Sequence, residues 1–507
     1  MYGAVCVAIL TPGRTQPNRG LDGIHVGQGL MAGEVTQNSV ILQSRLTSIC
    51  PFRDQDAWVD RKWSGIPGVD GVGRFEISET PDFTTLFETE WFTAKYGHDY
   101  IIKTKIGNLT PNTQYYYRLR YGFSPEEVKL SRSYKFKTHP LQNSAEKVSF
   151  AVVTGMNYAR FHFIGVPGTT DSLGNPDPIA PATGNDKRLG YPGLKALLEK
   201  APDYFIATGD NVYYDTPGLG RAETEHQMRM KYQDQFFQAR FINLFTEVPT
   251  YWMKDDHDYR FCDSDPITPS TARYGEDPNR PSHELGVRMF LEQLPVVDPR
   301  DSQPITYRTL RVNKHLQVWF IEGRDYRSPK GLPDGSEKSL WGAEQRAWLK
   351  RTLQESDATF KILLSPTPMV GPDSSRKRDN HTNPDGYKYE GEEFFRWLKK
   401  EGFLRKGFYI VCGDRHWQYH AVHPSGFEEF SVGTLVDQNA SIGFFPGDAG
   451  STDPSGDIKH LFHPRESSGG FLMFSVEEAE DGKAEVRFEF FNDLGESLYS
   501  ASKSPSG

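Results

Sequence analysis

The sequence predicts an α/β protein preceded by an all-β N-terminal part. Residues 21–138 contain short alternating runs such as NSVILQSRL, which Gly, Pro, Asn and Asp interrupt. From residue 148 onward, short apolar runs such as DYFIATG alternate with helical patterns such as GLKALLEK. The chain has 507 residues, with 47 Gly and 34 Pro, which favours more than one core and many turns.

The N-terminal part, residues 21–138, is predicted to be a β-sandwich. Its segment IGNLTPNTQYYYRLRYG (107–123) places Leu-Thr-Pro before alternating Tyr and Arg, which is typical of a turn that leads into a half-buried strand. This segment resembles the late strands of fibronectin type III and immunoglobulin-like modules. The polar stretch HPLQNSAEK (139–147) is predicted to be a linker.

The remaining residues, 148–507, are predicted to form the α/β domain. The runs KVSFAVV, HLQVWFIEG, FKILLSP and GFYIVCG are mainly apolar, as in strands buried on both faces, and AEQRAWLKRTLQES has a helical period. Ligands of such sheets bind beyond the carboxyl ends of the strands. Near the C-terminus, GGFLMFSVEE and KAEVRFEFFND alternate with period two and predict antiparallel strands.

Composition argues against several classes of function. Asp and Glu number 67 against 58 Lys and Arg, a net charge of -9, so no basic surface for nucleic acid or anionic lipid is expected. The 4 Cys lack CxxC spacing, which argues against a zinc knuckle or a disulfide scaffold. No window approaches the ~20 apolar residues of a membrane span, and MYGAVCVAIL lacks the basic leader of a clear signal peptide.

Three acidic or histidine clusters follow predicted strands. They are TGDNVYYD with Asp210, WMKDDHDYRFCDSD with Asp256 and His257, and VCGDRHWQYH with Asp414 and His416. Converging carboxylates repel one another unless cations neutralise them, so the pattern predicts two metal ions. Each cluster alone has a simpler interpretation: a Gly-Asp turn, a helix cap or solvated acidic turn, and, in the third, a structural His420.

These motifs resemble the PhoD-like (alkaline phosphatase D) family of calcineurin-type metallophosphoesterases. GDNVYYD is similar to that family's Gly-Asp-x-x-Tyr-x-Asp, DDHDYRFCDSD to its Asp-Asp-His-Asp-Tyr stretch, and GDRHWQYH to its Gly-Asp-x-His. The resemblance implies a metallophosphoesterase-type layered sandwich, with two central mixed sheets flanked by helices, after an immunoglobulin/fibronectin III-like β-sandwich. It also implies a periplasmic or secreted protein.

The resemblance also implies roles for individual residues. Asp210 would bridge two metals, Tyr213 and His416 would bind one of them, and Asp414 the other, with Asp256 as a further ligand at the catalytic centre. Tyr213 as a phenolate points to Fe(III), with Ca(II) or another divalent metal beside it. His257 would donate a hydrogen bond or a proton at the reacting phosphate.

Two positions depart from the family pattern. Gly155 in FAVVTGMNY stands where the family usually has Cys, so one thiolate ligand is missing. Cys262 stands where many relatives carry Asn, which makes it a candidate metal ligand, although a buried free Cys is also common. Asn157, two residues after Gly155, is predicted to line the substrate site.

The basic loop SSRKRDNHTNPDGYKYEG (374–391) is the predicted substrate-binding segment. Arg376, Lys377, Arg378 and His381 could neutralise phosphoryl oxygens, although most basic runs in loops are only solvated. A second cluster could support the same pocket or form an ordinary surface ion pair; it comprises Arg324, Asp325 and Arg327.

The predicted function is hydrolysis of phosphate monoesters, diesters or both by a metal-bound hydroxide at a dinuclear centre. The substrate would be a small-molecule, lipid or nucleotide phosphate ester, and a monomer is expected. The alternative is a non-catalytic binding or surface module with a degenerate metal site, because Gly155 removes one ligand.

Overall fold

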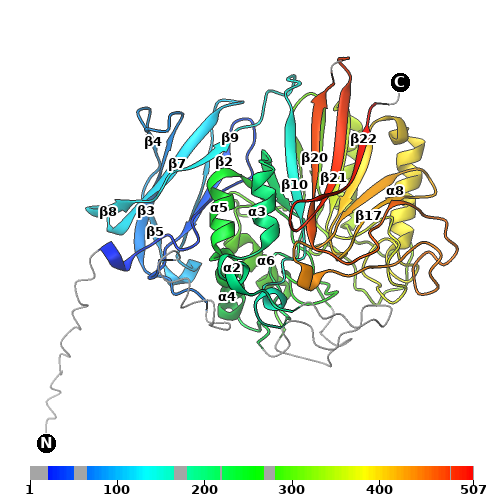
Figure 1. The fold of residues 1–507 in the computed structure, drawn as a ribbon, viewed down its shortest axis with the longest axis horizontal. Coiled ribbons are helices and arrows are strands. Elements are labelled where there is room, and N and C mark those ends of the chain that lie inside the picture. The colour runs from blue at the N-terminus through cyan, green and yellow to red at the C-terminus, as the bar shows by residue number, and fades with distance from the viewer. Residues whose placement is uncertain are drawn as a thin grey trace, which may run out of the picture.

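The computed structural model describes residues 21–50, 65–164, 180–216, 220–267, 280–479 and 481–505. Two central sheets dominate the fold (Figure 1). The first has nine strands in the order β22 (Ser497–Lys503), β21 (Ala484–Asn492), β20 (Gly470–Glu478), β10 (Val148–Val153), β11 (Tyr204–Ala207), β12 (Thr250–Trp252), β1 (Leu30–Gly33), β2 (Val40–Arg45) and β6 (Ile101–Ile106). The second has seven: β13 (Arg308–Arg311), β14 (Leu316–Phe320), β15 (Phe360–Ser365), β16 (Phe408–Cys412), β18 (Glu428–Val432), β17 (Gln418–Val422) and β19 (Lys459–Phe462).

Both central sheets are mixed. Strands β10, β11 and β12 are parallel to one another, as are β14, β15, β16 and β18. The chain returns to the first sheet at its end, where β20 pairs antiparallel with β10 and β21 pairs antiparallel with β20, as the alternation of GGFLMFSVEE and KAEVRFEFFND predicts. In Figure 1 these red strands stand next to the cyan β10, more than 300 residues away in the chain.

The inner faces of the two central sheets pack against each other. Phe430 of the second sheet stacks on Phe488 of the first with ring centroids 3.9 Å apart, and Tyr251 stacks on Phe320. Strands β11 and β15 are buried along their whole length, which explains their continuous apolar sequences. The hydrophobic core between the sheets fixes the relative positions of the strand ends.

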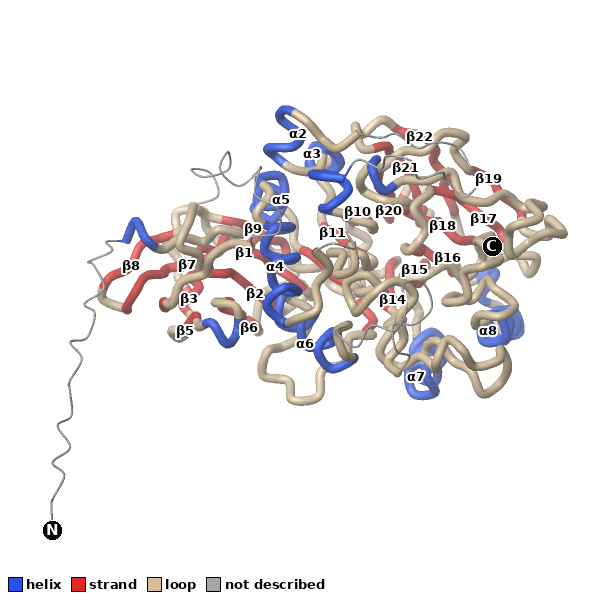
Figure 2. Tube along the Cα trace, turned by 90° about the horizontal axis from the view of Figure 1, so that it is seen from below, coloured by secondary structure: helices blue, strands red, loops and turns tan. Residues whose placement is uncertain are grey.

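Helices cover the two outer faces (Figure 2). Apolar side chains of α3 (Pro192–Glu199), α4 (Glu225–Phe236) and α5 (Ala239–Glu247) pack on the first sheet, and those of α7 (Gly342–Glu355) and α8 (Lys388–Lys400) pack on the second. The expected mixed α/β fold is thereby confirmed. The other helical segments are α2 (Gly184–Leu189), α6 (His283–Gln293), the π-helix η3 (Arg160–Ile164) and the 3-10 turns η1 (Leu21–Gly23), η2 (Tyr96–His98), η4 (Phe403–Arg405) and η5 (Asp437–Asn439). Within the described ranges, no helix is both long and apolar enough to span a membrane.

The N-terminal part adds a third, smaller sheet. It contains β4 (Phe87–Glu88), β3 (Gly71–Ser78), β7 (Gln114–Ser124) and β8 (Glu127–Leu130), with β5 (Phe92–Ala94) paired to β3 and β9 (Tyr134–Lys137) paired to β7. Its inner face shares a core with Leu42 of β2 and Ile102 of β6. Its likeness to fibronectin III or immunoglobulin modules stays a prediction, as do the domain bounds 21–138 and 148–507.

Hydrogen bonding continues from the N-terminal part into the α/β part. Gly33 of β1 pairs in parallel with Thr250 of β12, and the Glu34 amide donates to the Thr250 carbonyl over 3.1 Å. A buried polar junction adds to this contact, because Asp99 accepts from Arg45 on one side and from Gln233 of α4 on the other. Buried polar groups that are fully paired hold their elements in one arrangement.

Candidate metal centre

Three turns at the carboxyl ends of parallel strands carry the acidic motifs. Asp210 follows β11, the segment 255–258 follows β12, and Asp414 follows β16. Asp210 and Asp414 have φ of 53° and 60°, and each comes directly after a glycine. Asp is among the few residues that tolerate this left-handed region, so both side chains are presented by tight turns at the sheet edge.

Asp258 connects the turn after β12 to the turn after β11 by hydrogen bonds. Its side chain is fully buried and accepts hydrogen bonds from the backbone amides of Asp255 (2.7 Å), Asp210 (3.2 Å) and Asn211 (3.3 Å). Burial raises the pKa of Asp258 to about 7. Its contacts are all with the backbone and with Asn211, so Asp258 organises the turns while the neighbouring carboxylates face the site.

Tyr213 and His416 converge on Asp210. The Tyr213 hydroxyl donates to Asp210 Oδ2 over 2.8 Å, and its oxygen lies 3.2 Å from His416 Nε2. His416 Nε2 lies 3.5 Å from the same Asp210 oxygen. Burial and the positive charge of Arg160 lower the pKa of His416 well below its usual value, so the ring is neutral and keeps a lone pair. A phenol, a carboxylate and an imidazole within mutual contact form a donor set for one cation.

A carboxylate cluster adjoins this donor set. Asp210, Asp255 and Asp256 offer oxygens within 4.8 Å of one another, and all three side chains are buried. Burial, with a contribution from Asp256, raises the pKa of Asp210 to about 7. Within the described part of the chain, Asp210 Oδ1 and Asp255 Oδ2 have no hydrogen-bond partner. Buried carboxylate oxygens without partners are costly, so these residues fit bound cations.

The side chain of Arg324 neutralises only part of the negative charge of this carboxylate cluster. Arg324 is fully buried; its Nε donates to Asp255 Oδ1 over 2.7 Å, and its Nη2 lies 3.3 Å from Asp379 Oδ2. The interpretation of Arg324 as an ordinary surface ion pair is therefore wrong. Nearby, Asp325 pairs with Lys254 at 2.8 Å, and Arg327 donates to the Asp379 carbonyl.

Asp414 contacts two positively charged side chains, those of Arg415 and Lys377. Arg415 pairs with Asp414 Oδ2 and also with Asp373 Oδ1 at 2.9 Å, while Lys377 Nζ lies 3.4 Å from Asp414 Oδ1. Burial opposes the charged carboxylate, but Arg415 and Lys377 together lower the pKa of Asp414. Asp414 is therefore ionised at neutral pH.

His257 lies beside the cluster as an imidazolium. Its Nδ1 is 2.7 Å from Asp215 Oδ1, and its ring stacks on Tyr213 at 4.3 Å. Burial opposes the charged ring, but Asp215, Asp256 and Asp210 outweigh it and raise the pKa of His257 well above its usual value. Asp215 thus occupies one ring nitrogen and leaves Nε2 to face a ligand.

Cys262 lies within reach of the same centre. Its Sγ belongs to a group with Asp256 and His257 in which the potential ligand atoms are within 4.8 Å of one another. Burial, with a contribution from Asp263, raises the pKa of the Cys262 thiol to about 12. The thiolate form would then require a cation beside it. Its ligation stays a prediction.

Gly155 leaves no room for the missing thiol. Its φ is 66°, and a Cβ placed there would lie 2.4 Å from Thr434 Oγ1 and 2.9 Å from Thr434 Cβ. The Gly155 carbonyl accepts hydrogen bonds from Thr434 Oγ1 (2.7 Å) and Asn439 Nδ2 (3.1 Å). Asn439 Nδ2 also donates to the Tyr213 oxygen over 2.8 Å. In this chain Thr434 therefore occupies the space beside Gly155, and Asn439 links Gly155 to Tyr213.

Replacing Gly155 by Ala is expected to destabilise the protein by about 2–4 kcal/mol, because left-handed backbone strain adds to overlap with Thr434. Gly482→Ala is the matched control: Gly482 has φ of 78° but no atom within 4 Å of its Cβ position. It should cost only about 1 kcal/mol. Urea unfolding measures both. Equal losses in the two variants would show that Thr434 yields and that a side chain can be accommodated.

The predicted substrate residues are placed in different surroundings. Asn157 is buried and lies 3.5 Å from Asn439 Oδ1 through its Nδ2, next to the Tyr213 donor set. His381 is enclosed away from the cluster, with Nε2 3.1 Å from Glu390 and its ring against Trp341.

The two predicted arginines lie on the outside of the loop. Arg378 is 56% exposed and pairs with Asp385, and Arg376 is exposed. Substrate binding by Arg376, Arg378 and His381 remains a prediction; the contacts found for Arg378 and His381 are with Asp385 and with Glu390 and Trp341, outside the acidic centre.

Sequence reasoning did not assign several side chains that contact the centre. Asp215 is the last residue of GDNVYYD, and its spacing from Asp210 could have identified it. Asp263 lies within DDHDYRFCDSD but was not assigned a role, whereas Lys377 was predicted as part of the basic substrate-binding loop. Asn439 in VDQNAS gives no recognisable signal, because its role depends on the fold bringing η5 to Gly155.

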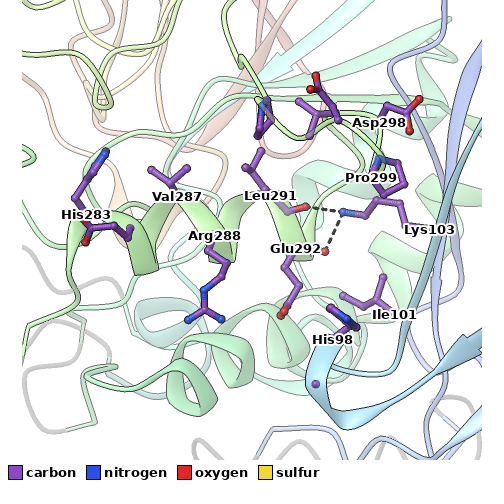
Figure 3. Close-up of a pocket in the computed structure, with 15 residues that line it drawn as sticks. His98, Ile101, Lys103, His283, Val287, Arg288, Leu291, Glu292, Asp298 and Pro299 are labelled. Atoms are coloured by element: carbon purple, nitrogen blue, oxygen red, sulfur yellow. Dashed lines mark hydrogen bonds between the residues drawn. The ribbon is translucent and has the colours of Figure 1, made fainter.

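Helix α6 backs the acidic segment 255–258 from behind. A Cβ at Gly286 would lie 2.2 Å from the Tyr259 carbonyl, and His283 Nδ1 is 2.6 Å from the Tyr259 hydroxyl. At the other end of α6, Lys103 Nζ donates to the carbonyls of Leu291 (2.7 Å), Glu292 (2.9 Å) and Leu294 (2.7 Å). A groove of about 830 Å³ runs along α6 from His283 to Glu292 (Figure 3), and none of its lining residues belongs to the acidic centre.

The fold is similar to the folds of two phosphatases of known structure. It is similar to the structure of PhoD, with 17% identity and a TM-score of 0.68 over 94% of this chain and 89% of that chain. It is also similar to purple acid phosphatase PPD1 from yellow lupin (Lupinus luteus) seeds, with 15% identity and a TM-score of 0.57 over 94% of this chain and 73% of that chain. No curated protein matches the chain.

The chain belongs to the PhoD-like phosphatase family. The family model of the PhoD-like phosphatase matches residues 181–443, and that of the PhoD-like phosphatase N-terminal domain matches residues 14–140. The family resemblance drawn from the three acidic motifs is confirmed. Family membership supports hydrolysis of phosphate esters and implies metal ions at the acidic and histidine cluster.

Proposed function

We propose that this protein hydrolyses phosphate esters at a dinuclear metal centre. The observation that carries the proposal is the juxtaposition of Asp210 with Tyr213, His416, Asp255 and Asp256, in which buried carboxylate oxygens lack partners among the described residues. Monoesters, diesters or both would be substrates, as small-molecule, lipid or nucleotide esters. The protein would act as a monomer.

The proposed ligands divide between two ions that share Asp210. Tyr213 and His416 would hold one, and Asp256 and Asp414 the other, with Cys262 as an additional candidate. Cations bound there would polarise phosphoryl oxygens and lower the pKa of a water molecule beside phosphorus. The phenol of Tyr213 favours Fe(III) for the first ion, and the carboxylates favour Ca(II) or another divalent metal for the second.

His257 would act on the substrate and not on the cations. Its raised pKa keeps the ring protonated at neutral pH, and Asp215 fixes the ring through Nδ1. The Nε2–H group can then donate a hydrogen bond or a proton to an ester oxygen as negative charge develops on it. Nearby, Arg324 would hold Asp255 and Asp256 in place.

Thr434 leaves no room for a side chain at Gly155, so this position cannot supply a metal ligand. This favours one alternative to the enzyme, a binding module with a degenerate metal site. Metal analysis of the purified protein, paired with hydrolysis of aryl phosphate monoesters and diesters, separates the two. Two bound ions with turnover of either ester support the enzyme. A protein that stays free of metal and inactive after reconstitution with iron and calcium supports the alternative.

Replacing His257 by Ala is expected to lower kcat by about 100- to 10,000-fold while metal content is retained, because the lost group acts on the ester oxygens. His226→Ala on the exposed face of α4 is the control and should leave kcat unchanged. Steady-state kinetics and metal analysis of each variant check this. If His257→Ala instead loses metal, His257 would have to be reassigned as a ligand.

A further inference from the structure

The basic loop turns one of three consecutive cations toward the acidic centre. Lys377 has an 18% exposed side chain, while its neighbours Arg376 and Arg378 point outward. Lys377 Nζ lies 2.8 Å from Asp263 Oδ1 and 3.4 Å from Asp414 Oδ1. Asp263 and Asp414 come from two different acidic motifs, so the ammonium spans the edge of the centre between them.

The ammonium of Lys377 has donor capacity to spare. It carries three N–H groups, and the contacts with Asp263 and Asp414 account for two of them. In the described part of the chain no third hydrogen bond or ion pair of Nζ is found, although the charge of Asp379 also acts on the ammonium. The third N–H group can therefore donate to an oxygen of an anionic ligand at the edge of the centre.

The loop does not need the Lys377 side chain to hold its shape. Asn383 Nδ2 donates to the backbone carbonyls of Lys377 (2.6 Å) and Ser375 (2.9 Å). Asp373 accepts from Asn380 over 2.6 Å and pairs with Arg415 at 2.9 Å. These contacts anchor the loop on both sides of residue 377, so its side chain is positioned by the loop rather than holding it.

Glu429 fixes the chain just before this loop. Its buried carboxylate accepts hydrogen bonds from the backbone amides of Met369 (2.6 Å), Val370 (3.0 Å) and Gly371 (2.9 Å). The segment that delivers Lys377 is thus rigidly connected to β18. A rigidly presented cation loses little conformational freedom when it binds an anion.

We propose that Lys377 binds a non-bridging phosphoryl oxygen of the ester substrate. This inference rests on the proposed function and adds a specificity to it. A phosphate monoester carries more negative charge than a diester, so the contact stabilises bound monoester more strongly. Lys377, and not the exposed arginines beside it, is then the loop's contribution to substrate recognition.

The test uses the full chain in its metal-loaded form, with Lys377→Met, Lys377→Gln and Lys377→Arg. The Met and Gln variants are expected to raise KM for an aryl phosphate monoester about 10- to 100-fold, with a smaller rise for the diester. The dissociation constant of inorganic phosphate should rise in parallel, while Lys377→Arg restores affinity to within about threefold. Lys399→Met, an exposed charge on α8, is the control and should change neither quantity.

Three results would overturn the proposal. The first is a phosphate affinity of Lys377→Met within about twofold of the parent. The second is loss of fold or of metal in both the Met and Gln variants, which would make Lys377 a structural strut. The third is a loss of affinity in Arg376→Ala or Arg378→Ala without one in Lys377→Met. If the parent protein hydrolyses neither ester, the proposed function fails, and phosphate affinity alone still decides the role of Lys377.

Discussion

Replacing Asp210 by Asn is expected to remove both metal ions and to lower kcat/KM by about 1,000-fold or more. Asp210 is the shared member of the two proposed ligand sets, since it contacts Tyr213 and His416 and also lies among the carboxylates of Asp255 and Asp256. Asn tolerates the left-handed backbone of this turn, so the fold should survive the change. Metal analysis and steady-state kinetics measure the two losses.

The same variant should behave differently without metal. Removing one buried carboxylate relieves repulsion from Asp256, so metal-free Asp210→Asn is expected to have a higher Tm than the metal-free parent protein. Asp481→Asn on the surface is the control and should alter neither Tm nor activity. Retention of both ions and of turnover in Asp210→Asn would refute the shared-ligand assignment.

Replacing Arg324 by Met is expected to destabilise the protein by about 3–5 kcal/mol. Arg324 is fully buried, and its removal leaves Asp255 and Asp379 as uncompensated buried charges. Arg351→Met on α7 is the matched control, because Arg351 is 61% exposed and only 3.9 Å from Glu355 in an i,i+4 pair. That change should cost about 0.5 kcal/mol or less.

Urea unfolding of the metal-free and metal-loaded forms measures the Arg324 effect. Bound cations would neutralise part of the exposed acidic charge, so the loss should be larger in the metal-free form. A loss below about 1 kcal/mol in both forms would mean that the carboxylates around Arg324 become protonated at little cost.

Local patterns predicted the strands and the positions of the acidic turns because both depend on short-range sequence. A continuous apolar run such as that of β11 can be buried on both faces only in a central strand, and the Gly-Asp step after it marks the turn. Asp210, Asp256 and Asp414 could therefore be placed at strand ends from the sequence, whereas their division between two sheets, with β11 and β12 in the first and β16 in the second, could not. The sequence also shows that Gly155 replaces the usual Cys of the family. It does not show that Thr434 fills the space a side chain would need there, because Thr434 lies far away in the chain.

Side-chain direction within loops could not be predicted in the same way. Arg376, Lys377 and Arg378 are chemically similar neighbours, and only the fold of the loop around Asn383 and Asp373 decides that Lys377 faces the centre. The burial of Arg324 follows from the packing of the two sheets, which no local pattern records. Long-range packing thus determines which charges face the site.

The two family models cover residues 14–140 and 181–443 separately, but the pairing of β1 with β12 joins these two parts of the chain by hydrogen bonds. A chain that began at residue 148 would lack β1, β2 and β6 and would expose the edge of β12, the strand that leads directly into Asp255 and Asp256. Unpaired strand edges invite association with other chains. Residues 21–138 therefore supply both the small third sheet and three of the nine strands of the first central sheet, and are not an appendage that can be removed.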